Sequence, residues 1–181
     1  MKKKRGLSIL VLLVLLLTIT IGYSLLSTTL NINGTTTISK PTWDIHFANV
    51  QVTSGSQTSG STAPVIATTG TNAGLLITYA PKLNQPGDFY EFTADVVNGG
   101  TINAKLGSIT LGGVSTAQDV YTNYTVKYSN GTAIAANDTL NAGATRTIRV
   151  RVEFDSDITQ SQLPSSAQTL NLTCALVYNQ A

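Results

Sequence analysis

Cysteine, histidine and charged residues are scarce in this sequence. Its 181 residues include one Cys, Cys174, and one His, His46, while Asp, Glu, Lys and Arg together make up 11%. A single cysteine excludes a disulfide within the chain, and small exported eukaryotic domains often depend on such bonds. We therefore interpret the composition as that of a bacterial exported protein, with hydroxyl and amide side chains in place of charges on its surface.

The same scarcity argues against catalysis. A zinc site needs three or four His, Cys or carboxylate ligands, and a peptidase usually places them in an H-E-x-x-H helix, which the sequence lacks. Asp44 and His46 are two residues apart and could meet, but we interpret them as the polar face of a strand. Cys174 alternates with Leu172 and Leu176, which predicts a core residue rather than a nucleophile. We predict no active site, cofactor or metal centre, and no enzyme activity.

Two further groups of charged residues have structural interpretations. Asp155-Ser156-Asp157 has the oxygen spacing of a weak calcium site, and we favour a solvated turn while leaving calcium open. Four charged residues are predicted to form cross-strand pairs on a solvent face: Glu91, Asp95, Arg149 and Arg151.

The N-terminus carries an export signal. The basic residues at positions 2–5 precede an uncharged apolar run that starts at Leu7. Counted strictly to Ile21, the run has about 15 residues and fits a signal peptide, with Ser24 and Ser27 as candidate cleavage positions. Counted to Leu26 it has about 20 residues, enough for a membrane-spanning helix. Residues 1–27 are thus predicted to be a signal peptide, or a membrane anchor through residues 7–26 if uncleaved.

The charge of the exported part excludes one class of partner. The leader supplies four of the eleven basic residues, so seven remain against nine acidic residues, a net charge of −2. Such a surface has no electrostatic reason to bind nucleic acid.

Residues 28–181 are predicted to form one all-β domain, because apolar residues alternate with polar ones and are interrupted by Gly, Asn, Pro and Ser. Trp43, Ile45 and Phe47 share a face, and a change of parity near Ala48-Asn49 predicts a β-bulge. Thr53–Thr62 is a flexible loop by composition. Later strands are predicted at Pro64–Thr69, Leu75–Ala80, within 86–100, Ile102–Leu111, Val120–Tyr128, near Ile134, 145–155 and Leu170–Tyr178, with one helical turn at Thr159–Gln162. The Asn-Gly pair in Ser129–Thr132 predicts the turn that joins Val120–Tyr128 to the short strand near Ile134.

Two strands have the clearest inward faces. The predicted core residues are Tyr90, Phe92, Ala94 and Val96 in the first of them, and Ile148, Val150, Val152 and Phe154 in the second. Strands that are apolar on one face must bury that face against another sheet. The predicted fold is therefore an antiparallel β-sandwich, of jelly-roll or immunoglobulin-like type, behind an N-terminal hydrophobic helix.

One stretch resembles a known family. In "LNQPGDFYEFTADVVNGGTINAKLGSI" (Leu83–Ile109) a Pro-Gly-Asp turn leads into a strand that ends at Asn-x-Gly. Together with the basic leader and the Thr-rich opening, over roughly residues 1–110, this resembles the TasA/camelysin family of exported bacterial proteins. The resemblance implies a jelly-roll subunit of biofilm-matrix fibres, processed by a dedicated signal peptidase. It also implies that five residues mark shared turns, namely Pro86, Gly87, Asp88, Asn98 and Gly100.

Three hypotheses on function follow. If the leader is cut, Leu30, Ile32 and Ile38 lie on one face of a free strand that could complete a sheet edge in a neighbouring copy and so build a fibre at the cell surface or in the matrix. The strand could equally fold back into its own sheet. If the leader is retained, the protein is a membrane-anchored binding or adhesion module whose partners are cell-surface or matrix components. A metallopeptidase, as camelysin-type relatives have been called, is the third hypothesis.

Overall fold

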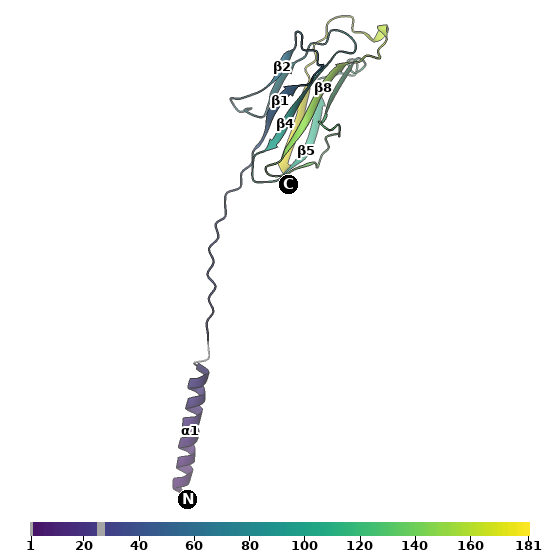
Figure 1. Cartoon of the computed structure of the whole chain (residues 1–181). Coiled ribbons are helices and arrows are strands. Elements are labelled where there is room, and N and C mark those ends of the chain that lie inside the picture. The colour runs from purple at the N-terminus through teal and green to yellow at the C-terminus, as the bar shows by residue number, and fades with distance from the viewer. Residues whose placement is uncertain (1, 25–27) are drawn as a thin grey trace. The chain divides into compact units, whose positions relative to one another are not determined.

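The computed structural model of the 181-residue chain describes residues 2–24 and 28–181. The chain divides into two units, Met1–Ser39 and Lys40–Ala181, and each is considered by itself. Figure 1 shows the single helix of the first unit and the strands of the second.

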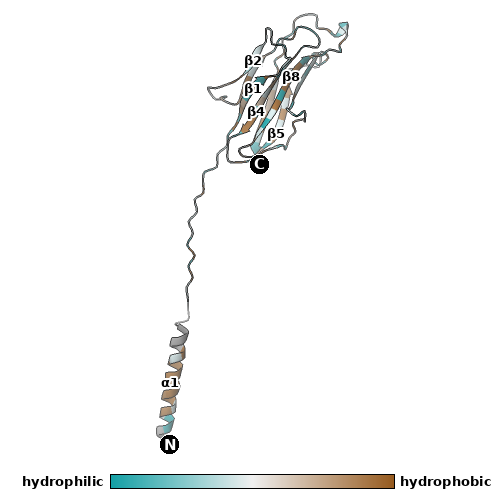
Figure 2. Ribbon diagram, in the orientation of Figure 1, coloured by the Kyte–Doolittle hydropathy of each residue, from teal (hydrophilic) through white to brown (hydrophobic). Residues whose placement is uncertain are grey.

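The first unit begins with helix α1, Lys2–Ser24. Its middle is continuously hydrophobic (Figure 2). Within the described residues, no helix of this chain is both long enough and apolar enough to cross a membrane. The candidate cleavage residue Ser24 is the last residue of α1. The other candidate, Ser27, lies outside the described residues, as do positions 25 and 26 of the predicted anchor.

The predicted opening strand is absent. Residues 28–44 belong to no helix or strand, and Leu30, Ile32 and Ile38 are 88%, 98% and 90% exposed. An isolated extended segment has no partner for its backbone groups, so an alternating sequence alone does not make it a strand. Trp43 was expected in the core, but it precedes the first strand and is 46% exposed.

The second unit contains antiparallel sheets of four, three and two strands. The four-stranded sheet has the order β1-β4-β8-β6, the three-stranded sheet β7-β5-β9, and the two-stranded sheet β2-β3. The strand bounds are β1 Ile45–Val52, β2 Thr62–Ile66, β3 Ile77–Ala80, β4 Phe89–Asn98, β5 Ala104–Gly112, β6 Thr122–Tyr128, β7 Thr139–Leu140, β8 Thr145–Phe154 and β9 Thr173–Gln180.

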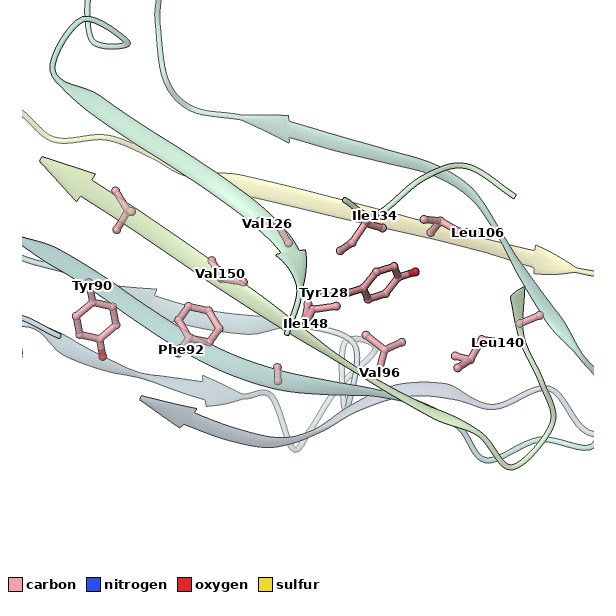
Figure 3. Packing of buried hydrophobic residues seen from close by; sticks show 13 residues of the cluster. Tyr90, Phe92, Val96, Leu106, Val126, Tyr128, Ile134, Leu140, Ile148 and Val150 are labelled. Atoms are coloured by element: carbon pink, nitrogen blue, oxygen red, sulfur yellow. The ribbon is translucent and has the colours of Figure 1, made fainter. Parts of the chain in front are cut away.

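The core joins the four-stranded and three-stranded sheets. Figure 3 shows its side chains converging from strands of both sheets. The buried residues are Tyr90, Phe92, Ala94 and Val96 of β4, Val126 and Tyr128 of β6, Ile148, Val150 and Val152 of β8, Ala104 and Leu106 of β5, Leu140 of β7, and Ile134. The inward residues predicted for the two clearest strands are confirmed as buried, except that Phe154 is only half-buried, and on the outward face of β4 Glu91 is buried as well. Burial of this apolar surface is the main stabilising contribution to the fold.

Several local predictions are also confirmed. The pairing of β1 with β4 shifts register between Ala48 and Gln51, and Asn49 has a φ of 48° at this bulge. The Asn130-Gly131 turn connects Tyr128 to Thr132, and a single bridge joins Lys127 to Ala133. A short 3₁₀ helix, Gln160–Gln162, occupies the predicted helical turn.

Two predictions need correction. The strands predicted near β2, β3 and β9 are offset from the observed ones: the first starts two residues late and ends three residues late, the second starts two residues early, and the third starts three residues early and ends two residues early. Alternation and ladder hydrogen bonds do not end at the same residue. The segment Thr53–Thr62, expected to be a flexible loop, is attached to β4: the Thr53 amide donates to the Glu91 carbonyl at 2.8 Å and the Gln57 amide to the Phe89 carbonyl at 2.7 Å.

Candidate assembly surface

Residues Thr28–Ser39, which we call the N-terminal segment, are uncharged and exposed. The alternating Leu30, Ile32 and Ile38 give it one apolar face if it becomes extended. One Leu and two Ile side chains exposed on one short uncharged segment are unusual for a surface that remains solvent-exposed. The segment is therefore the first candidate for a contact with another protein surface.

The chain enters the β-rich unit directly after this segment. The Thr101 amide donates to the Thr42 carbonyl at 3.0 Å, and the Thr42 amide donates to the Thr101 hydroxyl at 2.9 Å. The Gly99 amide donates to the Asp44 carbonyl at 2.8 Å. These bonds fix the point of entry beside the end of β4, where Ile45 pairs with Asn98. We call this end of the unit the Asn98 end.

Asn98 organises the Asn98 end. It is fully buried, and its side-chain amide donates to the carbonyls of Ile102 at 2.9 Å and Leu140 at 3.0 Å. Its side-chain oxygen accepts from the Gly100 amide at 3.1 Å. A Cβ on Gly100 would lie 2.5 Å from the Thr42 carbonyl oxygen, so only glycine allows the entering chain to pass this closely. Both residues therefore hold the turn after β4 against the entry point.

Pro86, Gly87 and Asp88 form the turn at the opposite end of β4. Gly87 has a φ of 91°, and one carboxylate oxygen of Asp88 accepts the amides of Asn84 at 2.8 Å and Gln85 at 3.1 Å. The turn is tied to the end of β8, because the Gly87 amide donates to the Phe154 carbonyl and the Phe154 amide donates to the Asp88 carbonyl, both at 2.8 Å. The five residues of the turn motif thus lie at both ends of β4 and do not gather into one site.

The three-stranded sheet ends in an edge strand. β9 pairs with β5 along its whole length, and within the described residues its other side pairs with no strand. Its inward side chains, Cys174, Leu176 and Tyr178, are only half-buried, whereas Ala104 and Leu106 of the neighbouring β5 are fully buried. The core is therefore incompletely covered on the open side of β9.

The two-stranded sheet approaches this open side. From β3, Tyr79 packs edge-to-face on Phe92 of β4, with ring centroids 4.8 Å apart. Its hydroxyl lies 3.5 Å from the hydroxyl of Tyr124 on β6. Burial, and secondarily the nearby Cys174 thiol, raise the pKa of Tyr79. Side chains from β3 and β6 thus meet, and Cys174 of β9 is near enough to act on both tyrosines electrostatically, although β3 and β9 share no hydrogen bond in the described chain.

The predicted charge pairs form for Glu91 but not for Asp95, and the setting of Glu91 differs from the prediction. Glu91, expected on a solvent face, is buried, and its carboxylate lies 3.8 Å from Arg149 and 3.4 Å from Arg151. The segment that contains Ser56 is bound to the Glu91 backbone, because the Ser56 hydroxyl donates to the Glu91 carbonyl and accepts from the Glu91 amide, both at 3.0 Å. Instead of forming an ion pair, the Asp95 carboxylate accepts a hydrogen bond from the Thr147 hydroxyl.

The residues weighed for metal binding do not form a ligand cluster. Asp44 and His46 meet at 2.9 Å, while Asp155 accepts the Asp157 amide at 2.9 Å in a local turn. Among the described residues, no group of three or more His, Cys, Asp or Glu side chains lies close enough to hold a metal ion.

A polar hollow of about 300 Å³ lies beside the Asn130-Gly131 turn. Tyr128 donates its hydroxyl to Asp138 at 2.8 Å, and the Arg146 guanidinium lies 5.1 Å from the centre of the Tyr128 ring. Burial, with Asp138 as hydrogen-bond acceptor, raises the pKa of Tyr128 to about 12. The hollow is shallow, and its polar groups are already paired with each other.

Comparison with known proteins adds no family. No protein-family model matches the chain, and no curated protein matches it.

Sequence reasoning missed the two features that define the surface. The open side of β9 depends on which strands pair, and alternation does not encode pairing. The approach of Tyr79 to Tyr124 joins residues 45 positions apart. A weak signal was present in the last strand, which has neither charge nor proline from Thr173 to Gln180.

Proposed function

We propose that this chain is an exported, non-catalytic structural protein of the bacterial cell surface or extracellular matrix, whose copies assemble into fibres by strand addition. The β-rich unit is then a β-sandwich of jelly-roll or immunoglobulin-like type, and residues 28–39 of each copy supply a strand to the next. The likeness of Leu83–Ile109 to the TasA/camelysin family supports the same proposal.

The observation that carries the proposal is the exposure of the N-terminal segment. Leu30, Ile32 and Ile38 are at least 88% exposed in a stretch without secondary structure. Burying a Leu or Ile side chain contributes about 1.5–3 kcal/mol, so three such residues supply a driving force for docking as an added strand. Because the donor segment and the accepting edge are different surfaces, the contact repeats head to tail and forms a filament.

The test begins with the mature protein from the medium and from cell membranes. Mass spectrometry of its N-terminal residue is expected to show a new terminus between Leu25 and Thr28, and electron microscopy is expected to show filaments. An intact leader found in membranes alone, without filaments, would instead support the membrane-anchored binding module.

Matched variants separate strand addition from other modes of assembly. In the full-length chain, Leu30→Asn, Ile32→Asn and Ile38→Asn together are expected to abolish filaments. The control changes the opposite face, with Thr29→Ser, Asn31→Ser and Asn33→Ser, and is expected to leave them intact. Filaments that persist in a chain lacking Thr28–Ser39 would refute the proposal.

A further inference from the structure

We propose that the open edge of β9, on the side facing β3, accepts the N-terminal segment of a second copy as a strand antiparallel to β9. The inference rests on the proposed function, since it names the acceptor for the added strand. Four observations support it: the free backbone edge, the lack of edge protection, the match in length and charge, and the direction of the entering chain.

The free edge lies beside an unfinished part of the core. The inward residues Cys174 and Leu176 of β9 are half-buried, as are Ile77 and Tyr79 of β3. All of them pack against the buried cluster, yet β3 and β9 belong to separate sheets. An added strand on β9 would pair with its free N–H and C=O groups and bury these side chains further.

The edge of β9 lacks the features that usually prevent strand addition. Native edge strands carry a charged residue, a proline or a bulge to block such pairing. Three of the other outer strands have such a feature: β1 has the bulge at Asn49, β2 contains Pro64, and β6 contains Lys127, whereas β3 and the two-residue β7 have none. β9, with the sequence TCALVYNQ, has none of them, and its outward Val177 is 48% exposed.

The N-terminal segment fits this edge in length and charge. At about 3.3 Å per residue, its twelve residues reach about 40 Å, and the eight residues of β9 need about 26 Å. About four residues are left to cross between two copies. Segment, β9 and β3 are all uncharged, so the pairing buries no charge.

The direction of the chain favours a second copy over its own edge. β9 runs toward the Asn98 end, because Gln180 pairs with Ala104 and the Ala181 amide donates to the Asn103 carbonyl. The N-terminal segment of the same copy also ends there, since the chain enters the unit at Thr42. Folding back would therefore make it parallel to β9. A segment that comes from a copy stacked on the opposite end runs antiparallel, which is the more stable pairing.

The lone cysteine makes the contact testable. Cys174 lies on the inward face of β9, and residues directly opposite each other on antiparallel strands are close enough for a disulfide. Inward positions of the segment are replaced one at a time in the full-length chain, as Leu30→Cys, Ile32→Cys or Gly34→Cys. Filaments are then oxidised with copper–phenanthroline and oxygen. Outward replacements Asn31→Cys and Asn33→Cys, and each inward variant combined with Cys174→Ser, are the controls.

The expected result is a ladder of disulfide-linked multimers in non-reducing gels for at least one inward variant, and its loss with Cys174→Ser. If filaments form but none of the inward variants gives disulfide-linked multimers, β9 is refuted as the acceptor, while strand addition itself is not. A disulfide within single chains would show folding back onto the same copy, and cross-linking that stops at dimers would show mutual exchange; either overturns the proposal. If the unmodified chain forms no filaments, the proposed function fails as well.

Discussion

The hydroxyl groups of Tyr79 and Tyr124 lie 3.5 Å apart, although the two residues belong to different sheets. Tyr79 comes from the two-stranded sheet and also packs on Phe92, while Tyr124 lies on the outer strand of the four-stranded sheet. One side chain thus spans the core beside the open edge of β9. Tyr79 is therefore the main link between the two-stranded sheet and the rest of the unit at this place.

Replacement of Tyr79 tests whether the ring or the hydroxyl makes that link. Tyr79→Ala removes the aromatic pair with Phe92 and opens a cavity, so we expect the free energy of unfolding to fall by about 3 kcal/mol. Tyr79→Phe keeps the ring and loses a long hydrogen bond, and a loss under about 1 kcal/mol is expected. Urea denaturation of both variants measures the difference. Equal losses would mean that the hydroxyl pair carries the contact.

Short-range features of the fold could be predicted from the sequence. The inward faces of β4 and β8 follow from alternation because side chains of a strand point to opposite faces in turn. The bulge at Asn49 follows from the change of parity before Val50. These features depend on a few neighbouring residues, and the described structure contains them.

Features that depend on distant residues could not be predicted. Glu91 has the parity of a solvent-facing residue, but it is buried, and Ser56, 35 positions away, is hydrogen-bonded to its backbone. Leu30, Ile32 and Ile38 have the pattern of a strand, but a strand also needs a partner, and no described sheet of the chain contains residues 28–39. The candidate assembly surface consists of the N-terminal segment and the open edge of β9, which pair with no strand in the described chain. Which strands remain unpaired depends on the strand order of the whole unit.

Asn98 is predicted to be a large single contributor to stability. Asn98→Ala leaves the carbonyls of Ile102 and Leu140 and the amide of Gly100 without their buried partner, which should cost about 2–4 kcal/mol. The matched control is Asn103→Ala, which removes one exposed hydrogen bond to the Ala142 amide and should cost about 1 kcal/mol or less. Thermal unfolding followed by circular dichroism compares the two. Similar melting temperatures would contradict the role assigned to Asn98.

The buried carboxylate of Glu91 is predicted to contribute more to stability than the half-buried carboxylate of Glu153. Glu91→Gln leaves Arg149 and Arg151 without their shared partner, but both arginines are 30–42% exposed and water replaces part of the loss. We therefore expect a decrease of about 1–2 kcal/mol in the free energy of unfolding. Glu153→Gln breaks only the 2.9 Å contact with Arg151 at the surface and should cost under about 1 kcal/mol. Chemical denaturation at low and high salt distinguishes the two pairs, since salt screens the exposed one more strongly.

The thiol of Cys174 is predicted to react slowly in the folded protein. Burial raises its pKa from 9.0 to about 11, so at pH 8 the reactive thiolate is about a hundredfold scarcer than in the unfolded chain. Alkylation by iodoacetamide, followed by mass spectrometry, should be slower by about that factor in the folded protein than in concentrated urea. The unassembled variant with Leu30→Asn, Ile32→Asn and Ile38→Asn is the right material, because a docked strand would shield the thiol further.

The same shift fixes the sign of a pH effect on stability. Because the folded state holds the Cys174 proton more tightly, its contribution to the free energy of unfolding is complete below pH 9 and is lost as the pH rises toward 11. Tyr128, with its pKa raised from 10.0 to about 12, adds a loss that begins near pH 10 and continues to about pH 12. Cys174→Ala should therefore flatten the curve of unfolding free energy against pH between pH 9 and 10, and leave in place the decline that begins near pH 10. A wild-type curve that stays level from pH 8 to 11 would show that the thiol is as solvated in the folded chain as in the unfolded one.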